Sequence, residues 1–387
     1  MKKIVILGST GSIGTSLINI IKKDKKNFKI ELISANKNYK KIIKQAKLFN
    51  IQNLIITNQN SFIKAKKILN KSNIKIFNDF NSLNKILKNK NIDYTMNAIV
   101  GLDGLLPTLK IINHTKKIAI ANKESIICGW NLIKNKLRKY NTKFIPIDSE
   151  HFSIWSLLNK SRNIDIENIY ITASGGPFLN YPTKKFKFIS LKSALNHPTW
   201  KMGRKISIDS ATMMNKVFEI IEAKKIFDIQ YNKLKILIHP KSYVHAVIKF
   251  KNGLIKILAH DTDMTIPIFN SIYPKLEKKI KTKKIDFVNL NNLKFQNIDK
   301  NKFPLVKVLD FIPPKDSLFE TILVSANDKI VNLFLNKKIK FFEISKFLLM
   351  ILSLKEFQKY KKIKPKSIKQ IADLNKYVSI KIDSLSV

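Results

Sequence analysis

The 387-residue chain has a single cysteine, few acidic residues and no long apolar run. The lone cysteine, Cys128, excludes a disulfide within the chain and a zinc site built from several cysteines, and it suits a reducing compartment. No apolar run approaches the roughly 20 residues that span a bilayer, and the first expected strand begins at Lys3, which leaves no room for a cleaved leader. We therefore expect neither a membrane protein nor a secreted one.

Basic residues strongly outnumber acidic ones: the chain has 72 Lys and Arg but only 27 Asp and Glu, which gives a formal net charge of +45. Such a charge favours a non-catalytic nucleic-acid-binding protein, which would bind tightly at physiological salt. Two features argue against that alternative: the lysines are dispersed among Ile and Asn, and arginine, the usual source of phosphate- and base-binding forks, is rare. We attribute the lysine surplus to nucleotide composition and expect no specific nucleic-acid partner, although small anions would be attracted.

The first part of the chain, residues 1–147, alternates short β-rich runs with segments of helix length. Apolar residues recur three and four apart in segments such as Ile13–Lys23 and Tyr39–Phe49. This alternation predicts an α/β fold with an N-terminal Rossmann-like domain, a doubly wound parallel sheet.

The pattern changes after this domain. Residues 148–275 are less regular and predict a central α+β catalytic domain, which includes a hairpin of Val244–Phe250 and Leu254–His260. We expect a polar linker over residues 276–302 and a C-terminal helical domain over residues 303–387.

A glycine-rich stretch, GSTGSIG, joins the first expected strand to the first helix. Gly8 would let the strand turn, Gly11 would let the backbone approach a pyrophosphate, and Gly14 would let the helix pack closely on the strand. The helix N-terminus would then face phosphate groups. Added hydroxyl donors are expected from Ser9, Thr10 and Ser12. The alternative is a tight turn that binds no ligand.

The end of the second expected strand bears on the choice of cofactor. The segment SANKN, residues 34–38, has no carboxylate to hold a ribose 2′-hydroxyl group. Lys37 and Asn38 could instead accept a 2′-phosphate. The sequence therefore favours NADPH over NADH.

An acidic motif, DSEH, follows the last strand of the first domain. Extended backbone would place Asp148 and Glu150 on one side, where carboxylates without a thiolate favour Mg²⁺ or Mn²⁺, with Co²⁺ as a further candidate. Glu219 and Glu222 share a helical face with Asn215. We expect Glu219 as the third ligand, because Asn215 and the adjacent Lys216, one turn earlier, could address a substrate anion. The alternative is a pair of carboxylates that caps a helix.

Three further segments carry polar groups beside turns. Lys123, flanked by Asn122 and Glu124, follows a strand whose end would face the nicotinamide crevice; the alternative is a solvated lysine. Ser174 precedes two glycines and could bind an oxyanion, or the segment could be an ordinary turn. The segment His197–Gly203 resembles a mobile loop in which Trp200 could close over a ligand, the alternative being a rigid turn with a core tryptophan.

These motifs together resemble the 1-deoxy-D-xylulose 5-phosphate reductoisomerase family of isoprenoid biosynthesis. The resemblance covers nearly the whole chain, through GSTGSIG, ANKES, DSEH, SGGPF, HPTWKMGRKISIDSATMMNKVFE, IHPKS and, more weakly, SANDK. It implies a cytoplasmic homodimer that converts a sugar phosphate, 1-deoxy-D-xylulose 5-phosphate, to 2-C-methyl-D-erythritol 4-phosphate in the non-mevalonate pathway. The metal would act as a Lewis acid in a retro-aldol rearrangement, and NADPH would then donate hydride.

The resemblance also implies roles for individual residues. Contacts to NADPH are expected from Gly8, Thr10, Gly11, Ser12, Ile13, Lys37, Asn38, Asn122, Glu124 and Gly203. Metal ligands are expected to be Asp148, Glu150 and Glu219. Substrate contacts are expected from Lys123, Ser149, Glu150, Ser174, His197, Trp200, Ser210, Asn215, Lys216 and Glu219. The candidate catalytic residues are Glu150 for proton transfer, Lys123 for charge stabilisation, and His197.

The chain departs from the family pattern at four places. Asn36 and Val217 stand where the family usually has glycine, His260 replaces the first residue of a GxPDM motif, and Asp328 replaces a frequent glutamate. None is an expected metal ligand, so we expect activity to be retained.

A Rossmann dehydrogenase of another class, such as a semialdehyde dehydrogenase, is the enzymatic alternative. That chemistry requires a catalytic cysteine, and Cys128, in a helix-like segment, is the sole candidate. Full activity after Cys128→Ala would exclude it.

Overall fold

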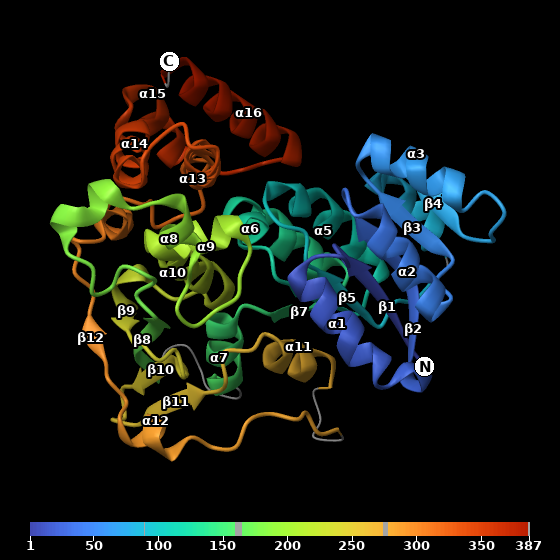
Figure 1. The fold of residues 1–387 in the computed structure, drawn as a ribbon, viewed down its shortest axis with the longest axis horizontal. Helices are drawn as coiled ribbons and strands as arrows, with labels where there is room; N and C mark the ends of the chain where they lie inside the picture. Colours follow the sequence, from blue (N-terminus) through green and yellow to red (C-terminus); the bar gives the residue numbers. More distant parts are fainter. Residues whose placement is uncertain (89, 159–164, 274–277, 386–387) are drawn as a thin grey trace. The chain divides into compact units, whose positions relative to one another are not determined.

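The computed structural model describes residues 1–88, 90–158, 165–273 and 278–385, and the chain divides into two compact units (Figure 1). Unit 1 comprises Met1–Ile126, Asn131–Asp148 and Met264–Ile280, and unit 2 comprises Ile127–Trp130, Ser149–Asp263 and Lys281–Val387. The expected boundary after residue 275 falls at residues 274–277, which lie outside the described part of the chain. The finer division into three domains and a linker stays a prediction.

Unit 1 contains a seven-stranded sheet in the order β4-β3-β2-β1-β5-β6-β7, with every pair of neighbours parallel. The predicted Rossmann-like sheet is therefore confirmed. Its strand order reverses at β1, and ligands of such sheets bind where the order reverses, at the carboxyl ends of the strands. The strands are β1 Lys2–Leu7, β2 Phe28–Ala35, β3 Asn53–Ile56, β4 Lys75–Phe77, β5 Tyr94–Asn97, β6 Lys117–Ile120 and β7 Lys143–Pro146.

The helices of unit 1 bury one apolar side against this sheet. In α1 the buried side chains of Leu17, Ile18 and Ile21 recur with helical spacing and share a core with Ile4 and Ile6 of β1. The α-helices are α1 Ser12–Lys22, α2 Tyr39–Phe49, α3 Gln59–Ile68, α4 Leu83–Ile86, α5 Leu105–Ile111, α6 Lys123–Lys139, four residues of which fall in unit 2, and α11 Thr265–Ile272.

Helix α11 belongs to unit 1 although it follows the central part of the sequence. Its residues Ile268 and Ile272 are buried in the same core as β1, and the hydroxyl groups of Ser271 and Tyr94 lie 2.7 Å apart. A segment distant in sequence therefore completes the core of the nucleotide-type sheet.

Unit 2 contains a mixed five-stranded sheet in the order β11-β10-β8-β9-β12. Strands β8 and β9 are parallel and the other neighbouring pairs are antiparallel, so the expected hairpin is confirmed as β10 and β11. Strand β12 comes from the stretch expected to be a linker. The strands are β8 Ile166–Ala173, β9 Leu234–Ile238, β10 Val244–Phe250, β11 Ile255–Ala259 and β12 Gln296–Asn297.

Helix α10, Met214–Phe227, is the most enclosed helix that bears on the site. Eleven of its fourteen residues are buried, including the polar residues Lys216, Glu219, Glu222 and Lys225. Charged side chains on a helix enclosed in this way must find partners in the interior. The other α-helices of unit 2 are α7 Ser149–Leu157, α8 Leu191–Leu195, α9 Arg204–Ala211, α12 Phe287–Asn291, α13 Phe319–Leu335, α14 Phe341–Ser353, α15 Lys355–Gln358 and α16 Ile368–Leu385.

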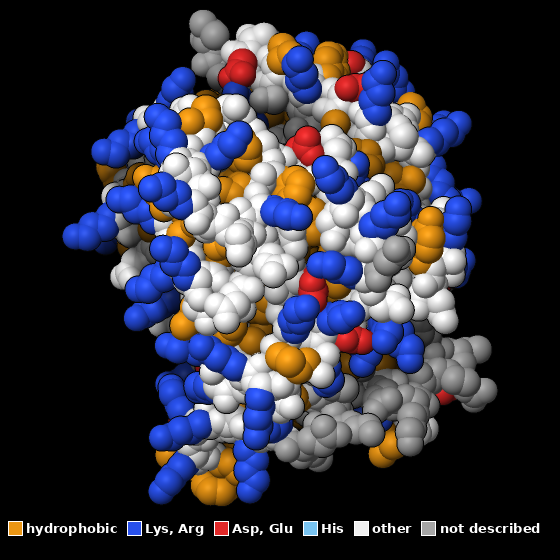
Figure 2. Space-filling view, turned by 90° about the vertical axis from the view of Figure 1, so that its right-hand side faces the viewer, with side chains coloured by type: hydrophobic (Ala, Val, Ile, Leu, Met, Phe, Trp, Pro, Cys, Tyr) orange, Lys and Arg blue, Asp and Glu red, His pale blue; other side chains and the backbone are white. Residues whose placement is uncertain are grey.

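The positive charge does not form a single patch on the face of the molecule shown in Figure 2. On the face drawn in Figure 2, Lys and Arg side chains are scattered across the molecule with apolar and neutral groups between them, and they do not gather in one patch. A nucleic-acid-binding surface concentrates such groups along a stripe or groove. Among the described residues, no helix combines the length and the apolar character needed to cross a bilayer.

Candidate active site

The glycine turn after β1 owes its shape to two of its three glycines. Gly8 has a φ of +82°, and a Cβ atom there would lie 2.7 Å from the carbonyl oxygen of Ala98. A Cβ atom on Gly14 would lie 2.4 Å from the carbonyl oxygen of Gly8, whereas one on Gly11 would lie 3.6 Å from the same atom. Packing therefore requires glycine at positions 8 and 14, while Gly11 leaves room for a ligand beside the N-terminus of α1.

Alanine substitutions should separate these two roles. We expect Gly14→Ala to lower the melting temperature, because its methyl group would overlap backbone atoms. Gly11→Ala should leave the melting temperature unchanged and weaken NADPH binding, because its methyl group would meet only the ligand. Thermal unfolding followed by circular dichroism and cofactor titration by fluorescence would test the pair. A Gly11→Ala protein that binds NADPH normally would contradict the assignment.

The hydroxyl groups of the turn do not all face a ligand. Ser9 is fully buried, and its hydroxyl group donates to the Gln45 side chain at 2.7 Å. The expectation that Ser9 donates to phosphate is therefore wrong, because the fold uses this hydroxyl group to attach the turn to α2. Thr10 is half-buried and Ser12 is exposed, so both stay accessible.

The loop after β2 places Lys37 at the surface, where it is accessible to a ligand. Lys37 is exposed, and Asn38 caps α2 by accepting a hydrogen bond from the backbone N–H of Lys41 at 3.1 Å. Asn36, where the family usually has glycine, donates to the Thr57 hydroxyl group at 2.8 Å. This hydrogen bond holds the Asn36 side chain against the residue that follows β3, so the departure does not by itself block the loop.

Asn122 and Glu124 lie at the start of α6. The Asn122 side chain accepts from the backbone N–H of Ser125 and donates to the carbonyl oxygens of Ile99 and Gly101, each at 2.6 Å. The side chain of Asn122 is therefore used by the fold, which leaves its backbone for the expected cofactor contact. Glu124 is buried beside it.

The expected metal ligands come together. One carboxylate oxygen from each of Asp148, Glu150 and Glu219 lies within 4.8 Å of the others. The Lys123 ammonium group forms an ion pair with Asp148, and the Lys216 ammonium group lies 3.2 Å from Glu150 and pairs with Glu219. Three carboxylates without a thiolate form a donor set that fits a hard divalent cation such as Mg²⁺.

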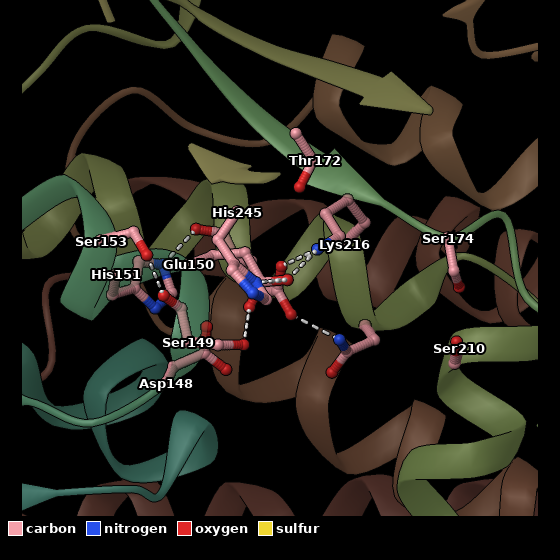
Figure 3. Close-up of polar contacts among 12 residues, drawn as sticks. Asp148, Ser149, Glu150, His151, Ser153, Thr172, Ser174, Ser210, Lys216 and His245 are labelled. Carbon is pink, nitrogen blue, oxygen red and sulfur yellow. Dashed lines mark hydrogen bonds and ion pairs between the residues drawn. The ribbon is translucent and has the colours of Figure 1, made fainter. Parts of the chain in front are cut away.

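Glu150 is held in its charged form. Burial opposes ionisation, but the charge of Lys216, the nearby His245 ring and the hydrogen bond from Ser149 lower the pKa of Glu150 well below its usual value. The Ser149 hydroxyl group donates to Glu150 at 2.5 Å. Figure 3 shows the side chains of Glu150 and Lys216 turned toward each other, with His245 beside them. The carboxylate is thus ready to serve as an anionic ligand.

Two histidines near these carboxylates were missed in the sequence. The Nε2 atom of buried His151 donates to the carbonyl oxygen of Glu219 at 2.9 Å, which fixes the backbone of an expected ligand. The Nδ1 atom of His245 lies 4.0 Å from Glu150, and its ring stacks on that of His260 with 3.8 Å between centroids. Two features of the sequence could have pointed to them: His151 is the last residue of the DSEH motif, and His245 is a single histidine in the apolar strand VHAVIKF.

Ser174, His197 and Ser210 form a separate polar group in unit 2. The Nε2 atom of His197 lies 3.2 Å from the Ser174 hydroxyl group and 3.0 Å from that of Ser210. Figure 3 shows the two serines next to each other, on different elements. These three side chains offer donors to one small anion.

The protonation state of His197 follows from its other nitrogen. The Nδ1 atom accepts the backbone N–H groups of Thr199 and Trp200 at 3.2 and 3.0 Å, so the ring proton sits on Nε2 and points to the serines. Burial, together with the charge of Lys216, lowers the pKa of His197 to about 4. A neutral His197 therefore orients the loop that carries Trp200 and presents one N–H group to the serine pair.

Trp200 and Gly203 occupy the segment expected to be mobile. Trp200 is half-buried and meets the His245 ring edge-on, with 6.1 Å between centroids. Gly203 caps the N-terminus of α9, the helix that ends with Ser210 and Ala211. Trp200 is thus not a buried core residue, and it contacts His245, the histidine beside Glu150.

The remaining departures are accommodated by packing. Val217 is fully buried on α10, and the Lys205 ammonium group lies over the ring of the next residue, Phe218, 5.6 Å from its centroid. Asp328 lies 2.7 Å from the same Lys205 ammonium group. The shorter acid therefore still reaches a partner on α9.

Cys128 does not suit nucleophilic chemistry. Its side chain is buried, and burial raises the pKa of the thiol well above its usual value. A catalytic cysteine needs an accessible thiolate at neutral pH. The position thus argues against a cysteine-dependent dehydrogenase.

Family models match most of the chain. The model described as 1-deoxy-D-xylulose 5-phosphate reductoisomerase matches residues 4–129, and the model for the C-terminal domain of that enzyme matches residues 144–227. A further model, for the DXP reductoisomerase C-terminal domain, matches residues 260–379.

Individual proteins agree with these models. The chain is 63% identical over 388 residues to the 1-deoxy-D-xylulose 5-phosphate reductoisomerase of Pelagibacter ubique, with 100% of both chains covered. It is 41% identical over 347 residues to the Clostridium novyi protein of the same name, covering 89% of this chain and 90% of the relative.

Solved structures of similar proteins contain ligands. One, of DOX-P reductoisomerase in complex with NADPH, fosmidomycin and magnesium, has a TM-score of 0.91 and 29% identity, with 100% of this chain and 98% of the other covered. Another, of the Zymomonas mobilis enzyme in complex with NADPH, has a TM-score of 0.87 and 30% identity, with 100% and 99% covered.

Proposed function

The chain belongs to the 1-deoxy-D-xylulose 5-phosphate reductoisomerase family, and on this basis we propose that it converts 1-deoxy-D-xylulose 5-phosphate to 2-C-methyl-D-erythritol 4-phosphate. It is an NADPH-dependent oxidoreductase that requires a divalent cation, for which Mg²⁺ is the first candidate. The observation that carries the proposal is the carboxylate group of Asp148, Glu150 and Glu219 with Lys216 at its edge. When bound, the cation polarises the substrate oxygens and NADPH supplies hydride.

We assign cation binding to the three carboxylates. Glu150 would also adjoin the reacting oxygens and would move the proton of a substrate hydroxyl group during the rearrangement. Lys123, paired with Asp148, would stabilise negative charge that develops on the substrate. Ser149 orients Glu150 by its hydrogen bond, and it would meet the substrate on the same side.

The phosphate of the substrate is assigned to the polar group around His197. Hydroxyl groups, a neutral imidazole N–H group and an ammonium group together suit a phosphate dianion. Contacts remote from the reacting bonds orient the sugar and contribute binding energy. The residues proposed for this subsite are Ser174, His197, Ser210, Asn215 and Lys216, and Trp200 would exclude water when its loop closes.

NADPH is assigned to the glycine turn and to the loops after the neighbouring strands. The first turn of α1 has N–H groups without partners in the helix, which suit the pyrophosphate. Lys37 suits the 2′-phosphate because it is exposed and cationic. The proposed contacts come from Gly8, Thr10, Gly11, Ser12, Ile13, Lys37, Asn38, Asn122, Glu124 and Gly203.

A spectrophotometric assay tests the activity. Loss of NADPH absorbance should require 1-deoxy-D-xylulose 5-phosphate together with Mg²⁺ or Mn²⁺, and EDTA should abolish it. NADPH oxidation that persists without the metal would contradict the proposed chemistry. Product analysis by mass spectrometry would separate the coupled rearrangement and reduction from reduction alone.

We further propose that the protein works in the cytoplasm as a homodimer. Strand β11 supports the dimer, because it is the outermost strand of its sheet among the described residues, and Ile255 and Ile257 on it are 59% and 48% exposed. Exposed apolar edges pair readily with another copy of the same strand.

Light scattering after size-exclusion chromatography would test this interface. Wild-type protein should elute at about twice the monomer mass of 44.7 kDa, and Ile257→Lys should shift it toward monomer by placing charge on the apolar edge. Ile380→Lys, on the exposed side of α16, serves as the matched control and should leave the dimer intact. If the Ile257→Lys protein remained a dimer, the interface would have to be formed by another part of the surface.

A further inference from the structure

Lys41 lies on the first turn of α2, and its ammonium group reaches the glycine turn. The Nζ atom donates to the carbonyl oxygen of Thr10 at 3.0 Å and to the hydroxyl group of Thr15 at 2.7 Å. Its backbone N–H group donates to the capping side chain of Asn38 at 3.1 Å. One residue therefore connects the two loops that are expected to hold the adenosine half of the cofactor.

We propose that Lys41 binds the 2′-phosphate of NADPH and is a main determinant of the preference for NADPH over NADH. The inference rests on the proposed NADPH dependence and adds a residue to it. Enzymes that prefer NADH place a carboxylate near this ribose, whereas this chain places an ammonium group at the base of the loop.

The chemistry of the ammonium group supports this assignment. An ammonium group has three N–H donors, and the hydrogen bonds of Lys41 to Thr10 in the glycine turn and to Thr15 on α1 leave the third for a ligand. Both of these acceptors are neutral, so the hydrogen bonds hold the group in place without cancelling its charge. A phosphate dianion is the partner that such a fixed cation favours.

Lys41 differs in this respect from its neighbours. Lys37 and Lys40 are exposed, whereas Lys41 is half-buried and anchored by two hydrogen bonds. A side chain that is already fixed loses less conformational freedom when the ligand arrives. Lys41 should therefore contribute more to discrimination than an exposed lysine of equal charge.

The test compares Lys41→Met with Lys40→Met. Each variant removes one positive charge from the same turn of α2, so general attraction of anions changes equally. Dissociation constants for NADPH and NADH are measured by cofactor fluorescence on the full-length protein without substrate or metal. Lys41→Met should raise the constant for NADPH by about tenfold or more, with that for NADH changed less than about twofold. Lys40→Met should change both by less than about twofold.

Other outcomes overturn the proposal. If Lys41→Met weakened the binding of NADPH and NADH equally, Lys41 would instead shape the glycine turn or contact the pyrophosphate. If the variant bound both cofactors as the wild type does, the hydrogen bonds of Lys41 would have only a structural role. Lys41→Arg should keep the preference, because it keeps a fixed positive donor.

A measurement on the wild-type protein covers the case in which Lys41→Met does not fold. Lysines are reductively methylated with and without saturating cofactor, and the modified positions are found by mass spectrometry. NADPH should protect Lys41 more than NADH does, while Lys40 reacts equally with both. Equal protection of Lys41 by the two cofactors would overturn the proposal. These measurements depend on binding and not on turnover. A negative result would therefore refute the role of Lys41 without refuting the proposed reductoisomerase activity, which the NADPH absorbance assay tests.

Discussion

Replacing Glu219 by glutamine is expected to lower metal-dependent NADPH oxidation by about a thousandfold or more, equivalent to about 4 kcal/mol. Glu219 is 1% exposed, and its oxygens lie among the side chains of Asp148, Glu150 and Lys216. Glutamine keeps the shape and removes the negative charge that a hard cation requires. The loss should appear in both turnover and the affinity for Mn²⁺, the latter measured by electron paramagnetic resonance without substrate.

The control for this variant is Glu167→Gln. Glu167 is a half-exposed acid in the same unit that pairs with Lys249 on the neighbouring strand, and it is not a member of the carboxylate cluster. It should turn over substrate and bind Mn²⁺ as the wild type does. Wild-type Mn²⁺ affinity in the Glu219→Gln protein, with folding verified by circular dichroism, would refute the assignment of Glu219 as a ligand.

The second large effect is expected on stability, at Lys225 of α10. Its ammonium group is buried and lies 2.6 Å from Asp316 and 2.9 Å from Glu320 of α13. Lys225→Met would leave two carboxylates without their cation, and removal of one partner from a buried ion pair costs about 3–5 kcal/mol. We expect a fall in melting temperature of about 6 °C or more, measured by differential scanning calorimetry.

A compensated variant separates lost charge from lost packing. In the Lys225→Met protein, Asp316→Asn and Glu320→Gln together should restore most of the stability, because neutral partners need no buried cation. If the triple variant is as unstable as Lys225→Met alone, the cost comes from packing of the lysine stem.

The pH dependence of Lys225→Met gives an independent check. Burial raises the pKa of Glu320 even in the wild type, against the lowering effect of Lys225. Without the lysine this pKa should rise further, so the folded variant binds a proton more readily than the unfolded chain does. Its stability should therefore increase as pH falls from 8 toward the ordinary carboxyl range, and the gap to the wild type should narrow. A constant gap over this range would contradict the assigned charges.

Much of the fold and of the candidate site was readable from local sequence. The alternation of strands and helices predicted the parallel sheet of unit 1, because period-two and helical spacing depend only on nearby residues. The glycine turn and the acids of DSEH were recognisable for the same reason, since each motif is a contiguous run at a junction between a strand and a helix.

Other site residues could not be identified in this way. His245 and Lys41 have ordinary local contexts, an apolar strand and a lysine-rich helix, and their partners lie in segments distant from them in sequence. Ser9 is the reverse case: the motif suggested a ligand contact, but Gln45 on a later helix takes its hydroxyl group. Burial and partners decide such cases, and both depend on how the chain packs.

The sequence by itself determined which chemical groups the protein can offer, namely a dinucleotide turn, three acids and a cluster of donors for a phosphate, because residue type and local spacing carry that information. Only the tertiary structure decided which groups meet: Glu219 joins the acids of DSEH, His197 turns its proton to two serines, and Lys225 closes a buried ion cluster. The reason is physical. Burial and electrostatic pairing act over a few ångströms in space, and packing of α10 within unit 2 brings together groups that the chain separates by dozens of residues.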